Sequence, residues 1–456
     1  MRAELLLPLA LIGAAAAYGQ RGRPHVPTAV ALATLLLCSG LVLLTPAGWT
    51  GRALGVDLGL SALSRLLLLA SFGLASLIVL LADAFPHSQH DEAVVLTVVA
   101  AAIAVSFSVG EPLVPVYSLA LVYLLISFLS GQHEADVSGR VPELAYFTII
   151  GIGVASLVVA FTLVQAYTVS RDPVLVRLIV PLMGIGFAIL LGAFPFHLWL
   201  PGVFLRGSFT ASALLVSVAC LASLGLLART ISSYPWLLLN SRGGELLLMG
   251  GLMGGLVCPA IAIWQKGLAR TLVYLAIGNT GLVLVGLALG TEESMEAALW
   301  IAVSQALAML LVIVGVRLCE PGRRQAEWRP AADRRSRALA LIAVGGVAMI
   351  GLPPLAAFPG KWELYQAAAG NQPLLAALLL AGALATAALA RIIWQAIQAS
   401  EPALSGADDS GLPARQTQIA AVGVASAMAA ALALGAFPSP LLTAISIAVQ
   451  HLSLPF

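Results

Sequence analysis

The stretch Gly351-Leu-Pro-Pro-Leu-Ala-Ala-Phe-Pro-Gly-Lys-Trp362 sets three prolines and one lysine between two long apolar runs. Proline has no backbone N–H and its ring clashes with the preceding helical turn, so Pro353, Pro354 and Pro359 leave carbonyl groups without donors. Lipid cannot satisfy such groups, and irregular backbone persists at membrane depth only inside protein or beside water. The stretch therefore predicts a helix that is interrupted within a membrane.

Lys361 stands at the end of this interruption. A lysine at the centre of a membrane costs at least about 2.5–3.5 kcal/mol on insertion scales. Two interpretations follow. In the first, which we favour because unwound backbone offers carbonyl partners, the side chain faces a polar cavity. In the second, the lysine marks the end of an interfacial turn.

Composition fixes the broad class. Of 456 residues, 60% are hydrophobic and 10% are charged, and apolar runs of about twenty residues recur throughout, which is typical of a polytopic helical membrane protein. The net charge of +2 does not suggest a nucleic-acid partner. Lys266 and Lys361 are the two lysines of the sequence, so any lysine-dependent chemistry must use them.

The apolar segments predict about fourteen transmembrane helices, each able to cross about 30 Å of hydrocarbon. A last segment, 438–454, carries two early prolines and is expected to lie along the membrane interface. The predicted spans are 3–19, 28–46, 59–82, 93–109, 112–130, 143–168, 173–194, 210–229, 245–264, 268–290, 294–318, 337–366, 373–396 and 417–435.

Charge distribution predicts the orientation. Basic loops favour the cytoplasm, and with fourteen spans the basic loops all fall on one side, opposite the acidic Glu292–Glu293 turn. The N-terminus is then outside, in an inner membrane of bacterial type. The basic residues concerned are Arg21, Arg23, Lys266, Arg270, Arg323, Arg324, Arg329, Arg334, Arg335 and Arg337.

No redox, nucleotide or metal site is expected in this chain. The four cysteines lack CxxC spacing, and there is no GxGxxG fingerprint or P-loop. We therefore predict no cofactor and no metal. A stand-alone enzyme is the least favoured class of function.

A second interrupted helix is predicted at Phe194-Pro-Phe-His-Leu-Trp-Leu-Pro201, where Pro195 and Pro201 flank His197. Two proline-interrupted segments in corresponding halves are typical of transporters built from inverted repeats. His197 titrates near neutrality and is a candidate for passing protons. Alternatively, it caps carbonyl groups that the prolines leave free.

Three motifs of this sequence resemble those of a known family. The family comprises the antiporter-like membrane subunits shared by respiratory complex I, Mrp-type sodium/proton antiporters and energy-converting membrane hydrogenases. Phe194–Pro201 looks like the family's PFHxWLP, 264–281 looks like its QxxxKRxLAYSSIxHxG, and 351–361 looks like its GLPPLxGFxGK. The resemblance implies two inverted five-helix repeats, each forming a half-channel, with a row of ionisable groups between them. It divides the chain into an N-terminal three-helix segment (1–92), two repeats (93–229 and 245–396) and a C-terminal segment (397–456).

Most of the family's relay residues are replaced in this sequence. Lys361 alone stands where the family keeps a terminal lysine or glutamate. The first-channel glutamate falls at Ala120 or, in another register, at Gly110 beside Glu111. The other replaced positions are Leu190, Cys220, about Met309, Asn279 and Ala269.

Three functions remain open. The first is a membrane subunit of a complex I-like or Mrp-like assembly that still moves a cation, with most relay groups lost. The second is a purely structural subunit of the same fold, and the third is a membrane partner in an Mrp-type or bicarbonate-accumulating complex. All three predict other membrane subunits and lipid as partners. The ion-translocation candidates are Lys361, His197, Lys266, Glu363 and Glu111.

Overall fold

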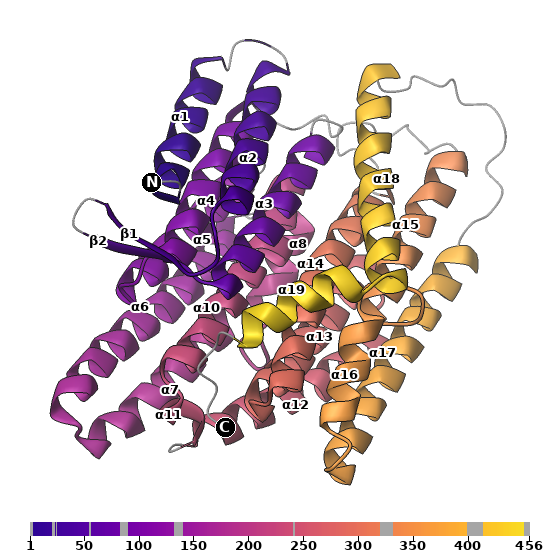
Figure 1. The fold of residues 1–456 in the computed structure, drawn as a ribbon. Coiled ribbons are helices and arrows are strands. Elements are labelled where there is room, and N and C mark those ends of the chain that lie inside the picture. Colours follow the sequence, from indigo (N-terminus) through magenta and orange to yellow (C-terminus); the bar gives the residue numbers. More distant parts are fainter. Residues whose placement is uncertain are drawn as a thin grey trace.

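The computed structural model describes residues 3–20, 23, 25–53, 56–82, 90–131, 140–239, 242–319, 332–398 and 414–450. Most of this chain forms long helices that run roughly alongside one another (Figure 1). Within the described ranges, ten helices are long and apolar enough to cross a membrane, three shorter apolar helices accompany them, and one bent pair passes the same test together. A polytopic helical membrane protein is thereby confirmed.

The first half of the chain contributes the helices on the left of Figure 1, and the second half those on the right. Most of the helices alternate in direction along the chain (Figure 1). The long helices of the first half are α1 (Leu6–Gly19), α2 (Val26–Leu44), α3 (Ala62–Ala82), α4 (His90–Ser108), α5 (Leu113–Gly131), α6 (Arg140–Ser170) and α7 (Pro173–Leu190). Those of the second half are α12 (Gly243–Trp264), α13 (Leu268–Leu289), α14 (Glu292–Cys319), α15 (Ala332–Ile350), α17 (Gln372–Gln398) and α18 (Ala414–Ala436).

Shorter helices complete these elements. Between the halves, one continuous helical rod passes through α9 (Phe209–Ala213), a π-helical turn at Leu214–Ala219, and α10 (Cys220–Ser233). The remaining short helices are η1 (Ala3–Leu5), α8 (Trp199–Arg206), α11 (Trp236–Leu239), α16 (Phe358–Ala367) and α19 (Ser439–Gln450).

Two rods form the centre of the bundle. In the most apolar stretch of α14, 94% of the residues are buried, and in that of the rod from Phe209 to Ser233 all are buried. The corresponding share is 33% for both α12 and α17. Helix α14 packs against α13, α15 and α16 from the second half of the chain and against α3, α9 and α10, which precede them in the sequence. It therefore joins the two halves of the protein.

The expectation of an all-helical chain misses one element. Strands β1 (Trp49–Ala53) and β2 (Val56–Leu60) form an antiparallel hairpin between α2 and α3. The hairpin extends its pairing to the α4–α5 turn, where Leu58 bridges Val109 and the amide of Gly110 donates to the carbonyl of Asp57 at 3.1 Å. These partners are distant in sequence, so local patterning gave no indication of them.

The C-terminal helices α18 and α19 meet at an angle of 74°. Two prolines, Pro438 and Pro440, flank the start of α19, and α19 then crosses α3 and α14 at a steep angle to both (Figure 1). That the segment 438–454 lies along the membrane interface stays a prediction. Residues 451–454 lie outside the described ranges, as do Arg21 and the basic residues Arg323, Arg324 and Arg329.

Candidate functional site

Residues 351–357 separate two helices, and Pro359 and Lys361 lie in the first turn of the second one. Helix α15 ends at Ile350 and α16 begins at Phe358, with the carbonyl of Ile350 facing the break. The Nζ atom of Lys361 donates a hydrogen bond to this carbonyl at 2.7 Å, and only 3% of the lysine is exposed. Lys361 therefore lies inside the protein, joined to the end of the preceding half-helix.

The aliphatic part of Lys361 packs on the turn itself. Gly351 adopts a φ of +81°, and a Cβ atom there would lie 2.8 Å from Cδ of Lys361. On the other side of the break, the indole Nε1 of Trp300 donates to the carbonyl of Ala356 at 2.6 Å. An ammonium group and an indole thus satisfy two carbonyls that the interruption removes from the helical pattern.

A small cavity adjoins Lys361. It is lined by α12, α13, α15 and α17, with Gly255, Pro259, Asn279, Ile350 and Gly382 among its residues. Asn279, which is 4% exposed, donates from Nδ2 to Oε1 of Gln305 on α14 at 3.0 Å. The amide of Gln305 in turn donates to the carbonyl of Ala276 and the hydroxyl of Thr280. A neutral polar network therefore runs from the cavity into the central helix α14.

The first proline segment has a comparable arrangement. Helix α7 ends at Leu190 and α8 begins at Trp199, whose indole Nε1 donates to the carbonyl of Ile189 at 3.2 Å. His197 is 4% exposed and its ring lies 5.6 Å from both the Phe194 ring and the Tyr274 ring. Its Nδ1 atom is enclosed and has no hydrogen-bond partner among the described residues.

Three positions at which the family resemblance predicts relay lysines are buried. Leu190, Cys220 and Met309 are 1%, 8% and 0% exposed. The hydroxyl of Tyr123 donates to the carbonyl of Leu190 at 2.5 Å and contacts Ser223 at 3.1 Å, and Tyr146 donates to the carbonyl of Tyr123. The hydrogen bonds around Leu190 and Tyr123 therefore join uncharged groups.

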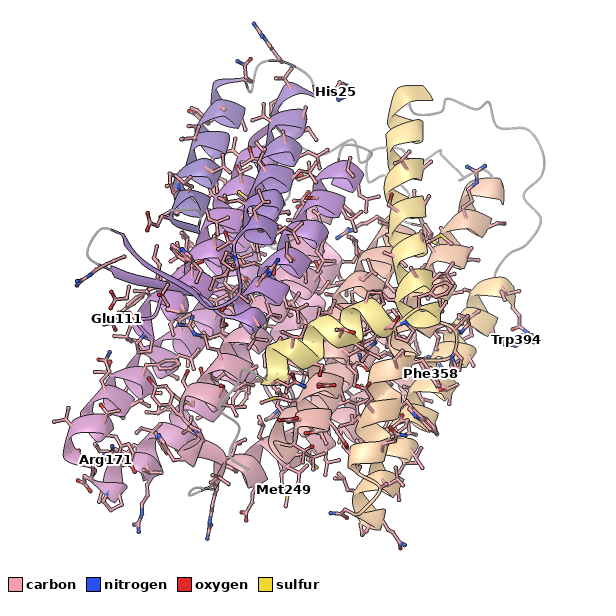
Figure 2. All side chains as sticks on the ribbon, viewed as in Figure 1. His25, Glu111, Arg171, Met249, Phe358 and Trp394 are labelled. Atoms are coloured by element: carbon pink, nitrogen blue, oxygen red, sulfur yellow. The ribbon has the colours of Figure 1, made fainter. Side chains whose placement is uncertain are left out.

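The remaining candidates are not brought to this region. Lys266 is exposed after α12, and Glu111 is exposed at the edge of the bundle, beside the β-hairpin (Figure 2). Glu363 is half-buried on α16, and its Oε2 atom is enclosed without a hydrogen-bond partner among the described residues. The structure thus places Lys361 beside Asn279 at one break and His197 alone at the other.

Sequence reasoning missed a buried carboxyl group. Glu92, near the start of α4, is 5% exposed and accepts a hydrogen bond from the Thr210 hydroxyl at 2.5 Å. Its position at the margin of an apolar run resembles that of any interfacial acid, so the sequence held no sign that the side chain turns inward.

Sequence reasoning also missed three arginines that donate hydrogen bonds to backbone carbonyls. Arg229 donates to Ser106 and Val109, Arg317 to Phe204 and Gly207, and Arg391 to Gln265. Each of these bonds joins separate helices or their ends. A single arginine close to the end of an apolar run was the available signal for this role.

Comparisons with known proteins agree with these features. The sequence model of the NADH:quinone oxidoreductase/Mrp antiporter transmembrane family matches residues 144–386. NADH-quinone oxidoreductase subunit N of Sphingopyxis alaskensis is 26% identical over 266 residues, which cover 54% of each chain. Subunit N of Halorhodospira halophila is 25% identical over 359 residues, covering 73% of this chain and 72% of that protein. The first of these matches thus spans about half the length of its relative.

Solved structures show the same fold at lower identity. A chain of the archaeal membrane-bound sulfane sulfur reductase is 17% identical with a TM-score of 0.81, covering 99% of this chain and 97% of its own. A chain of the Mrp complex from Dietzia is 20% identical with a TM-score of 0.81, at 99% and 52% coverage. A chain of Thermus thermophilus complex I is 20% identical with a TM-score of 0.75, at 97% and 99% coverage.

The family model matches more than half of the sequence, and it spans both interrupted helices and the cavity beside Lys361. The resemblance of the three motifs is thereby confirmed, and the chain belongs to the NADH:quinone oxidoreductase/Mrp antiporter transmembrane family.

Proposed function

We propose that this chain is an antiporter-like membrane subunit of a complex I-like, ion-translocating assembly, and that its own proton channel is degenerate. The relatives named above are NADH-quinone oxidoreductase subunits, and the structural neighbours come from complex I, Mrp and sulfane sulfur reductase assemblies. Other membrane subunits are therefore the proposed partners. The assembly would lie in an inner membrane of bacterial type, with the N-terminus outside.

The proposal includes fourteen transmembrane helices in two inverted repeats. Adding the three shorter apolar helices and the bent pair to the ten long helices gives fourteen among the described residues. Helix breaks after Leu190 and Ile350, each with an indole donating to a nearby carbonyl, support a repeated design. Such breaks are where transporters of this kind place their pathways. The repeats would span 93–229 and 245–396.

The observation that supports a degenerate channel is the small number of ionisable side chains enclosed within the described residues. A proton crossing about 30 Å of hydrocarbon needs titratable side chains or ordered water at hydrogen-bond intervals. In the part of the chain that the structure describes, the fully buried acidic and basic side chains are Glu92, His197 and Lys361. With Leu190, Cys220 and Met309 between the two breaks, a row of charges through the middle of the subunit is interrupted.

A purely structural role is the second candidate, and one contact favours it. Lys361 is bonded to the end of α15 at 2.7 Å, so its ammonium group acts as a cap on a broken helix. A group held in this way stabilises the break whether or not protons reach it.

Isolation of the native complex tests the assembly. We expect the subunit to migrate with at least one other antiporter-like or quinone-module subunit, because it belongs to a family whose named relatives are subunits of NADH-quinone oxidoreductase. Mass spectrometry of the band that contains this chain is the measurement. Recovery of the chain as an active monomer would contradict the proposal.

Replacing Lys361 with alanine tests the degenerate channel. The change leaves the carbonyl of Ile350 without its donor, which costs about 1–3 kcal/mol for an enclosed group. We expect less subunit in the complex, with proton translocation per electron unchanged in the complexes that do assemble. Subunit content, electron transfer and proton uptake in membrane vesicles are measured together.

Lys266→Ala is the matched control, because this second lysine is exposed beyond the end of α12. It is expected to change neither content nor translocation. If Lys361→Ala abolished translocation at normal subunit content and normal electron transfer, the subunit would be a working pump and the degenerate-channel proposal would be wrong.

A further inference from the structure

The cavity beside Lys361 has the size of a single water molecule. The volume open to a water molecule is about 10 Å³. A buried water needs roughly this much space together with two to four polar partners. The lining is mostly apolar, contributed by residues such as Leu275, Met349 and Ala385, so the few polar groups that face the cavity decide what it holds.

Three polar groups of the lining have unused hydrogen-bonding capacity. The Oδ1 atom of Asn279 is enclosed and has no partner among the described residues. Pro259 lies inside α12 and has no N–H, so it cannot donate to the carbonyl of Gly255 four residues earlier. Lys361 uses one N–H on Ile350, while an ammonium group carries three.

We propose that this cavity is the binding site of one structural water molecule. The water accepts a hydrogen bond from Nζ of Lys361 and donates its two hydrogens to Oδ1 of Asn279 and the carbonyl of Gly255. One donor and two acceptors match the capacity of water. An enclosed polar atom without a hydrogen-bond partner destabilises the folded protein, so a bound water that donates to Oδ1 of Asn279 removes this penalty.

The hydrogen-bonding groups disfavour the other small ligands. A sodium or potassium ion would lie beside Nζ of Lys361, which donates hydrogen bonds and offers a cation no oxygen ligand, and a site of this volume holds no water shell to complete its coordination. A chloride ion would pair with Lys361 but would meet two carbonyl-type oxygens, which are acceptors like itself. A neutral molecule that both donates and accepts is what remains.

The bound water would connect three helices through hydrogen bonds. It links Lys361 on α16 to Gly255 on α12 and Asn279 on α13, and Asn279 continues to Gln305 on α14. Amide side chains neither gain nor lose a proton near neutral pH. The water thus hydrates and orients Lys361, and the network beyond it fixes structure without relaying protons. This inference holds whether or not the subunit conducts ions.

A cryo-electron microscopy map of the intact complex, at a resolution that shows ordered waters, is the first test. We expect a density peak within hydrogen-bond distance of Nζ of Lys361 and Oδ1 of Asn279. Absence of the peak from a map that shows other enclosed waters would overturn the proposal, and this test needs no variant to fold. A peak bonded to neither side chain would also overturn it.

Asn279→Leu is the second test, because leucine has a similar size and no polar atom. We expect the peak to disappear and the lysine density to weaken. Thr271→Val is the matched control, since it removes a buried hydroxyl from the same helix outside the cavity and should leave the peak in place. Retention of the peak in Asn279→Leu would show that Asn279 does not hold the water.

Discussion

Replacing Gly281 with alanine is expected to remove most of this chain from the proposed complex. A Cβ atom at Gly281 would lie 2.6 Å from the carbonyl oxygen of Gly251 and 2.6 Å from the amide nitrogen of Gly255. Both are backbone atoms of α12, so no side chain can rotate away and the whole helix must shift. Overpacking a well-packed interior costs about 1–3 kcal/mol and sometimes more.

The close approach of α12 and α13 explains this sensitivity. Helices in a membrane gain no hydrophobic driving force over lipid, and small residues let their backbones meet closely enough for dispersion contacts to hold them. A Cβ atom added at Gly278 would lie only 2.7 Å from Cδ of Pro259. The contact is lined by the glycines Gly251, Gly254, Gly255, Gly278 and Gly281. Separating the helices would also widen the cavity beside Lys361.

The amount of subunit in the purified complex and the temperature at which the solubilised complex dissociates are the measurements. Gly250→Ala is the matched control, because it makes the same change on α12 where nothing lies within 4 Å of the added Cβ. Alanine there is expected to be neutral or slightly stabilising, since glycine costs roughly 0.5–1 kcal/mol within a helix. Equal behaviour of the two variants would show that the α12–α13 contact tolerates separation.

The helix breaks were predictable because proline acts locally. The segments around Pro195 and Pro353 are not helical, and proline favours such breaks because it cannot donate and clashes with the preceding turn. A single proline does not suffice, since Pro181 and Pro259 stand inside α7 and α12. The inward position of Lys361 was also favoured from sequence, because freed carbonyls need a donor. Its partner could not be named, since the bond to Ile350 depends on a left-handed turn at Gly351.

The elements that were missed depend on distant partners. The β-hairpin is anchored through Asp57 and Leu58 to the α4–α5 turn, about fifty residues along the chain. Glu92 is enclosed through its bond with Thr210, 118 residues away, and Arg229 reaches carbonyls more than 100 residues away. A single sequence does not show which distant residues contact one another. Buried charged side chains near helix ends are therefore the feature that is hardest to predict from it.

Trp300 is expected to be the most sensitive side chain at the second break. It is fully buried on the central helix α14, and its indole donates to the carbonyl of Ala356 at 2.6 Å. A Cβ atom at Gly360 would lie 2.6 Å from Cδ1 of Trp300, so the ring rests directly on the backbone of α16. The ring thus supports the irregular segment by packing and by one hydrogen bond.

Trp300→Ala is therefore expected to destabilise the subunit strongly, and Trp300→Phe to destabilise it less. In soluble cores, Trp→Ala costs about 3–5 kcal/mol. In a membrane the transfer part of this cost is reduced because lipid is also apolar, but the empty space and the unpaired Ala356 carbonyl remain. Phenylalanine restores much of the volume without the donor. The dissociation temperature of the solubilised complex, with subunit content, reports both effects.

Trp362→Ala supplies the control, since this tryptophan on α16 is 54% exposed and its loss opens no interior space. We expect the order of stability to be Trp362→Ala, then Trp300→Phe, then Trp300→Ala. The difference between the two Trp300 variants reports packing, and the loss in Trp300→Phe reports the hydrogen bond to Ala356 together with the smaller volume of phenylalanine. If Trp300→Phe were as damaging as Trp300→Ala, the carbonyl bond would dominate and packing against Gly360 would contribute little. If Trp362→Ala were the most damaging change, the exposed face of α16 would be the critical one, and the interior support assigned to Trp300 would be wrong.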